Sequence, residues 1–195
     1  MIEVEKKFIL TPEQEKTLID GAEFLGEKKN IDIGYDGPNF SLTTKDIWLR
    51  QRNGKFELKL PMNESLEKRI SDQYKELESD EEILAYFNTD IGQTLQDFLD
   101  KNGYEPILTI VTTRRKYKKD GFTIDLDSMD FGYNIAEIEY IAEDEKVKEA
   151  TSAIIEFAKK YNIDTTSVVR GKAVEYLRRN NPKHFQALID AKIVK

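Results

Sequence analysis

The chain has 195 residues, and its 30 lysine and arginine against 37 aspartate and glutamate side chains give a formal charge of −7. It has no cysteine, which excludes disulfides, thiolate zinc sites and cysteine nucleophiles, and its one histidine excludes a histidine-rich metal site. The length suits one domain with a core of its own, so we expect residues 1–195 to form a single domain.

The first ten residues, MIEVEKKFIL, are too charged for a signal peptide. No apolar run approaches the ~18 residues that a membrane-spanning helix needs. We therefore expect a soluble, cytoplasmic protein that does not bind a membrane. The acidic net charge argues against nucleic acid as a partner, because phosphate backbones bind basic surfaces. We expect a monomer.

Taken in chain order, the apolar pattern predicts strands and helices that alternate along the chain. A period of two residues predicts strands at 2–8, 31–35, 47–52, 56–60, 72–78, 107–117, 122–127 and 135–141. Helical periodicity predicts helices at 12–19, 80–87, 91–101, 144–161, 166–179 and 184–191. Thr11 and Pro12 fit the start of the first helix, and Asn53-Gly54 and Asp120-Gly121 predict tight hairpins. Antiparallel strands combined with helices predict an α+β fold.

Several predicted strands carry charged side chains on one face and apolar side chains on the other, because residues i and i+2 share a face. In the first strand, Val4 and Phe8 lie opposite the face of Glu5 and Lys7. Like charges two residues apart recur at Glu3/Glu5, Arg50/Arg52, Asp125/Asp127 and Glu137/Glu139.

Two interpretations fit this charged face. An antiparallel sheet can expose one face to water and cover the other with helices. Alternatively, eight strands close into a barrel whose charged face lines the interior, where one small ligand fits. Like charges this close repel each other and do not stabilise a solvated surface. Converging carboxylates can instead bind a hard cation, and converging guanidinium groups can bind a polyanion. The second interpretation predicts a tunnel that binds a polyphosphate together with Mg²⁺.

The charged segments also follow a recognisable order along the chain. They are Glu3-Val4-Glu5-Lys6-Lys7, Trp48-Leu49-Arg50-Gln51-Arg52, Glu57-Leu58-Lys59, Tyr74-Lys75-Glu76-Leu77, Thr113-Arg114, Asp125-Leu126-Asp127, Glu137-Ile138-Glu139 and Gly171-Lys172. The first resembles the ExExK motif of the CYTH superfamily, the triphosphate tunnel metalloenzymes, and the others resemble that superfamily in their order. Within the superfamily, the sequence is most similar to the thiamine triphosphatases.

This resemblance implies an eight-stranded antiparallel β-barrel, the triphosphate tunnel, with surrounding helices. It implies hydrolysis of the terminal phosphate of a small-molecule substrate, thiamine triphosphate, with Mg²⁺ or alternatively Mn²⁺ as the cofactor. The metal ligands that it implies are Glu3, Glu5, Glu76, Asp125, Asp127, Glu137 and Glu139. The substrate-binding residues that it implies are Lys7, Trp48, Arg50, Arg52, Lys59, Arg114 and Lys172. The predicted catalytic residues are Glu5, Lys59 and Glu139.

Trp48 bears on the choice of substrate, because it shares a strand face with Arg50. An indole is the best aromatic partner for a cation such as thiazolium, so we expect Trp48 to stack on the organic group. Alternatively, Trp48 fills a gap in the core and the substrate is inorganic tripolyphosphate. A class IV adenylyl cyclase and a non-catalytic polyphosphate-binding module are further alternatives. The many carboxylates argue against the module, since a pure phosphate binder has little need for them.

Two other residues allow simple predictions. Arg115 follows Arg114, and we expect it to point away from the tunnel, because neighbouring residues of a strand face opposite sides. We expect His184 to begin or cap a short surface helix.

Overall fold

The computed structural model describes residues 2–62, 74–89, 92–143 and 146–194, without the side chains of residues 2 and 3. Its strands are β1 (Ile2–Phe8), β2 (Glu23–Asp36), β3 (Trp48–Arg52), β4 (Lys55–Pro61), β5 (Tyr74–Leu77), β6 (Glu105–Lys119), β7 (Phe122–Met129) and β8 (Tyr133–Ala142). Its α-helices are α1 (Pro12–Ile19), α2 (Asp80–Tyr86), α3 (Leu95–Lys101), α4 (Val147–Lys159), α5 (Lys172–Asn180) and α6 (Pro182–Asp190).

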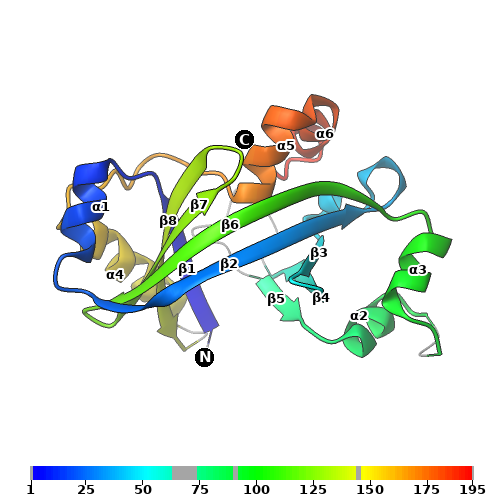
Figure 1. The fold of residues 1–195 in the computed structure, drawn as a ribbon, viewed down its shortest axis with the longest axis horizontal. Helices are drawn as coiled ribbons and strands as arrows, with labels where there is room; N and C mark the ends of the chain where they lie inside the picture. The colour runs from blue at the N-terminus through cyan, green and yellow to red at the C-terminus, as the bar shows by residue number, and fades with distance from the viewer. Residues whose placement is uncertain (1, 63–73, 90–91, 144–145, 195) are drawn as a thin grey trace. The chain divides into compact units, whose positions relative to one another are not determined.

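The strands form one antiparallel sheet in the order β1-β8-β7-β6-β2-β3-β4-β5 (Figure 1). The predicted α+β class with eight antiparallel strands is therefore confirmed. The chain divides into two compact units. Among the described residues, unit 1 comprises 2–29, 112–143 and 146–172, and unit 2 comprises 30–62, 74–89, 92–111 and 173–194. The single domain predicted for residues 1–195 stays a prediction.

Unit 1 packs the apolar face of β1, β7 and β8 against helices. Helix α4 contacts both β1 and β8 (Figure 1). Val4 and Phe8 of β1, Ile138 of β8 and Phe157 of α4 are all buried in one cluster. Because side chains alternate along a strand, burial of these apolar residues directs the charged residues between them to the opposite face of the sheet.

Unit 2 repeats this arrangement with other strands. Leu49 of β3 and Leu58 of β4 lie in a second buried cluster with Ile83 of α2 and Leu99 of α3. The Asn53-Gly54 turn joins β3 to β4, and both residues have positive φ angles of 49° and 87°, as a two-residue hairpin requires. The charged residues of β3 and β4 therefore share the face opposite this core.

Three predicted elements begin four or more residues away from where the structure places their first residue. Helix α5 begins at Lys172 rather than at residue 166. The side chain of Asp164 accepts hydrogen bonds from Thr166 and Ser167, and such local bonds compete with helix formation. Helix α3 begins after Thr94, whose capping box fixes the start. Strand β2 begins at Glu23, eight residues earlier than predicted. Residues 23–30 were not predicted as a strand because they lack an alternating apolar pattern.

Among the helices in the described part of the chain, none has the length and apolar content needed to cross a membrane.

His184 is buried, which corrects the prediction that it lies on a surface helix. It does stand in the first turn of α6, where its backbone N–H donates to the side chain of Asn181. Its ring is 0% exposed and stacks on Phe40 at a centroid distance of 3.9 Å. Its Nε2 lies 2.7 Å from Oγ1 of Thr43 and 3.5 Å from Oδ2 of Asp36. The polar neighbours that permit this burial come from a segment far away in the sequence.

This burial predicts a pH dependence of stability. Burial lowers the pKa of His184 below its ordinary value of 6.5, and the opposing effect of the Asp36 carboxylate is smaller. Below pH 6.5 the unfolded chain therefore binds a proton that the folded chain does not bind. We expect the wild type to lose stability relative to His184→Gln as the pH falls through this range, measured by urea unfolding. A difference between the two proteins that is independent of pH would contradict this prediction.

Candidate functional site

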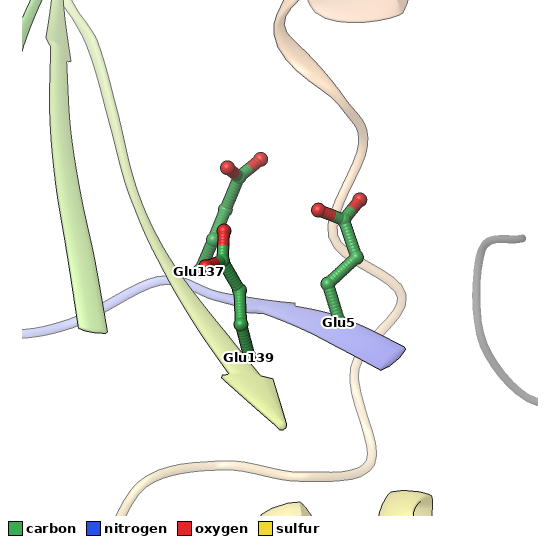
Figure 2. A group of neighbouring side chains, drawn as sticks. All are labelled: Glu5, Glu137 and Glu139. Atoms are coloured by element: carbon green, nitrogen blue, oxygen red, sulfur yellow. The ribbon is translucent and has the colours of Figure 1, made fainter. Parts of the chain in front are cut away.

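One face of the unit 1 sheet gathers carboxylates from three neighbouring strands. Glu5 lies on β1, Asp125 and Asp127 on β7, and Glu137 and Glu139 on β8. The register places Glu5 opposite Glu139, and Asp125 opposite Glu137. Figure 2 shows the side chains of Glu5, Glu137 and Glu139 extending to the same side of the sheet. The alternation predicted from the sequence thus becomes a cluster, because β8 lies between β1 and β7.

This cluster has the chemistry of a site for a divalent cation. One carboxylate oxygen from each of Glu5, Glu137 and Glu139 lies within 4.8 Å of the other two. In addition, Oδ1 of Asp125 is buried and lacks a hydrogen-bond partner among the described residues. A buried carboxylate oxygen without a donor costs free energy that a cation would recover. Carboxylate oxygens are the ligands that Mg²⁺ and Mn²⁺ prefer, so these residues fit such an ion.

Arg114 on β6 holds three of these carboxylates together. Its Nε and Nη2 donate to the two carboxylate oxygens of Asp127, at 2.6 and 2.7 Å. The same Nη2 donates to Glu137 at 2.6 Å, and Nη1 donates to Asp125. Burial acts to lower the pKa of Arg114, but the three carboxylates raise it well above its usual range. The guanidinium therefore stays charged and fixes the geometry of this face.

Lys116 also belongs to this face, although no role was predicted for it from the sequence. Its Nζ lies 3.3 Å from Asp125 and 3.6 Å from Glu139. Burial raises the pKa of Asp125 despite the opposing charges of Arg114 and Lys116. Its spacing in the sequence could have predicted this position, because Lys116 lies two residues after Arg114 and so shares a strand face with it.

Lys7 and Lys172 add positive charge beside Glu137. Lys7 Nζ lies 2.5 Å from the carboxylate of Glu5 on the same strand. Burial alone would raise the pKa of Glu137, but Lys7, Arg114 and Lys172 lower it below its usual range. Glu137 therefore stays ionised at neutral pH.

In unit 2, the arginines of β3 are each paired with an acid on a neighbouring strand. Arg50 Nη2 lies 2.5 Å from Glu57 on β4, directly opposite in register. Arg52 donates two hydrogen bonds to Asp32 on β2, at 2.7 and 3.0 Å. No role was predicted for Asp32 or Glu57 from the sequence. The pairing of Asp32 depends on strand register, which the sequence does not reveal.

Lys59 on β4 lies opposite Glu76 on β5, and its Nζ donates to that carboxylate at 2.6 Å. Burial would raise the pKa of Glu76, but Lys59, Arg50 and Arg52 lower it. Glu76 thus lies among cations of unit 2.

Trp48 begins β3 and lies opposite Lys59 in the register. Its Nε1 donates to Oδ1 of Asp46 at 2.9 Å, and the hydroxyl of Tyr74 donates to the same oxygen at 2.9 Å. Lys59 Nζ lies 5.8 Å from the centre of the Tyr74 ring. One carboxylate thus holds two aromatic side chains at the end of the charged face of unit 2.

The structure therefore sorts the predicted residues into two groups. Those gathered in unit 1 are Glu5, Lys7, Arg114, Asp125, Asp127, Glu137, Glu139 and Lys172. Those gathered in unit 2 are Trp48, Arg50, Arg52, Lys59 and Glu76. The backbone of Glu3 pairs with Ile141, but its side chain lies outside the described part of the structure. The individual roles stay predictions.

The chain is similar to known proteins along most of its length. The model of the CYTH domain matches residues 1–171, which include every predicted site residue except Lys172. The thiamine-triphosphatase of Macaca fascicularis is 28% identical over 208 residues, covering 97% of this chain and 90% of that protein. The thiamine-triphosphatase of Homo sapiens is 27% identical with the same coverage. The solved structure of the PH1819 protein from Pyrococcus horikoshii OT3 has a TM-score of 0.66 and 25% identity, and the match covers 92% of this chain and all of that one.

The Arg114 network leads to a prediction about stability. Arg114→Gln leaves buried carboxylates without their cation, and breaking a buried ion pair typically costs about 3–5 kcal/mol. We expect a loss of that size in chemical unfolding without divalent cations. Adding Mg²⁺ should recover more stability in the variant than in the wild type, because the carboxylates then lack another cation.

Arg115 supplies the matched control for this experiment. It pairs with Glu15 of α1 at 2.8 Å, on the face opposite Arg114 as predicted. That pair is partly exposed, so Arg115→Gln should cost less than about 1 kcal/mol. An equal cost for the two variants would show that the Arg114 network does not hold the face together.

Proposed function

Because the chain belongs to the CYTH domain family, we propose that it is a metal-dependent hydrolase acting on thiamine triphosphate. The products would be thiamine diphosphate and phosphate. The observation that carries the hydrolase assignment is the carboxylate cluster of Glu5, Glu137 and Glu139 with cations on the same face. The similarity to two thiamine-triphosphatases over 97% of the chain supports the choice of substrate.

The residues proposed to hold Mg²⁺ or Mn²⁺ are Glu5, Asp125, Glu137 and Glu139. When bound, the ion would neutralise phosphate oxygens and lower the pKa of a water molecule that attacks phosphorus. Asp127 fits a different role, because Arg114 donates to both of its carboxylate oxygens. We propose that Asp127 orients Arg114 and leaves the metal to its neighbours. Glu3 remains a proposed ligand.

Phosphoryl transfer needs positioning and charge neutralisation more than covalent help from the protein. Asp127 holds the edge of Arg114 formed by Nε and Nη2. Its Nη1, which now donates to Asp125, is the group proposed to turn to a phosphate oxygen. Lys7 and Lys172 would contribute further positive charge to the same phosphate.

The charged face of unit 2 is proposed to bind phosphate oxygens as well. Glu57 and Asp32 hold Arg50 and Arg52 in place, and a planar guanidinium has the geometry to bind two phosphate oxygens at once. Lys59 is proposed to stabilise negative charge on the leaving diphosphate. Glu76 then serves as the partner that orients Lys59.

Glu5 and Glu139 are proposed to act on the attacking water. They lie opposite each other in the register and belong to the same cluster, so both carboxylates are placed to accept its hydrogen bonds. One of them would receive the proton as the oxygen–phosphorus bond forms and the bond to the leaving phosphate oxygen breaks.

Inorganic tripolyphosphate is the second candidate substrate. The same charged groups would bind it, and the hydrogen bond from Trp48 to Asp46 gives the indole a structural role without any organic ligand. The two candidates therefore differ in what Trp48 does.

Replacing Glu5 tests the hydrolase assignment. Glu5→Gln keeps the size of the side chain but removes a proposed metal ligand, so turnover should fall more than ~100-fold, beyond the loss typical of residues that only support a ligand. The unfolding midpoint should change little without metal, since the variant loses the ion pair with Lys7 but also loses one charge that repels Glu137 and Glu139. Adding Mg²⁺ should raise the unfolding midpoint of the variant less than that of the wild type.

Glu15→Gln on α1 is the control variant for this experiment, and its turnover should stay normal. Normal turnover of Glu5→Gln would refute the role of Glu5.

Replacing Trp48 tests the choice of substrate. Phosphate release is measured with Mg²⁺ from thiamine triphosphate, tripolyphosphate and ATP, for the wild type and Trp48→Ala. A cation–π contact contributes about 0.5–2 kcal/mol, so the preference for thiamine triphosphate in kcat/KM should fall roughly 2- to 30-fold. Preference for tripolyphosphate with no effect of the variant would favour the second candidate. Inactivity on all three substrates would contradict both candidate functions.

A further inference from the structure

The segment between β2 and β3, residues 37–47, is tied to the end of β2 by one buried carboxylate. Asp36 is 2% exposed. Its Oδ1 accepts the backbone N–H groups of Gly37 and Leu42, both at 2.8 Å. Its Oδ2 accepts the backbone N–H of Thr43 at 3.2 Å and the hydroxyl of Thr43 at 2.6 Å. Four donors on one carboxylate fix the start and the middle of this segment.

The end of the segment carries the residue that orients Trp48. The backbone N–H of Asp46 donates to the carbonyl of Thr43 at 2.9 Å, and Asp46 has a left-handed φ of 62°. Its carboxylate accepts the hydrogen bonds of Trp48 Nε1 and the Tyr74 hydroxyl. The position of the indole therefore depends on the turn that Thr43 begins.

His184 of α6 closes this network from outside the segment. The Thr43 hydroxyl donates its hydrogen to Asp36, so it can only accept a hydrogen bond from Nε2 of His184, at 2.7 Å. This arrangement requires the neutral tautomer that carries its proton on Nε2. Phe40, from the same segment, stacks on the ring with an interplanar angle of 13°. His184 thus contacts the segment both by a hydrogen bond and by packing.

We propose that His184 is a positioning residue for Trp48. Through the Thr43 hydroxyl it fixes the turn that directs Asp46, and Asp46 in turn holds the indole. Given the proposed function, His184 then determines how well the organic group of the substrate is bound. The positioning itself does not depend on the identity of the substrate.

A spectroscopic test follows directly, because Trp48 is the sole tryptophan of the chain. Its fluorescence is recorded for the wild type, His184→Leu and His184→Gln, with circular dichroism to verify the fold. We expect a shifted emission maximum and stronger quenching by acrylamide in His184→Leu. His184→Gln should recover part of the wild-type signal, since its amide can donate to Thr43. Lys183→Gln, an exposed change on the same helix, should leave the spectrum unchanged.

Thr43 provides a second pair of variants that leaves α6 intact. Thr43→Val keeps the branched shape but removes the hydroxyl, and Thr43→Ser restores it. We expect Thr43→Val to reproduce the spectral change and Thr43→Ser to remove it. Wild-type fluorescence in folded His184→Leu and folded Thr43→Val would overturn the proposal.

Kinetics separate positioning of Trp48 from a general structural role. In His184→Leu, KM for thiamine triphosphate should rise with little change in kcat, and hydrolysis of tripolyphosphate should stay as in the wild type. Equal losses on both substrates would contradict the proposal. Inactivity of the wild type on both substrates would refute the proposed function but not the role of His184. The fluorescence of Trp48 still decides whether His184 positions the indole.

Discussion

Carboxylates on adjacent strands of one sheet face repel each other unless cations lie among them, and this requirement organises unit 1. Asp125 and Asp127 are almost fully buried, where an uncompensated charge is costly. Arg114 reaches both of them and Glu137 with three of its nitrogen atoms. The apolar face of the same strands is packed on α4, so the charged residues have no alternative position. The charged face and the core are thus two consequences of one alternating pattern.

The same ion pairs bear on the proposed function. Arg114 and Arg50 are paired with carboxylates in the protein, so binding a phosphate as proposed would require them to exchange one partner for another. Such an exchange costs less than removing a cation from water, because the site is already desolvated and oriented. A divalent cation on the carboxylates would favour this exchange, since it replaces the positive charge that the arginines withdraw.

Much of the candidate site could be predicted from the sequence, but the roles of Asp32 and His184 could not. Glu5, Arg50 and Glu137 were found because charges two residues apart mark a strand face and match a family pattern. Asp32 was missed because its partner Arg52 is 20 residues away. His184 was misplaced for the same reason, since Thr43 lies 141 residues before it. A local pattern contains no information about partners so far apart.

The sequence by itself determined which side chains share a face of each strand and which face is apolar, because that follows from the geometry of an extended chain. It also determined the membership of the family, through the order of the charged segments. Only the tertiary structure decided which acid meets which base, where α5 begins and why the one histidine is buried. These outcomes depend on strand register and on hydrogen bonds between distant segments. Both form only when the whole chain packs.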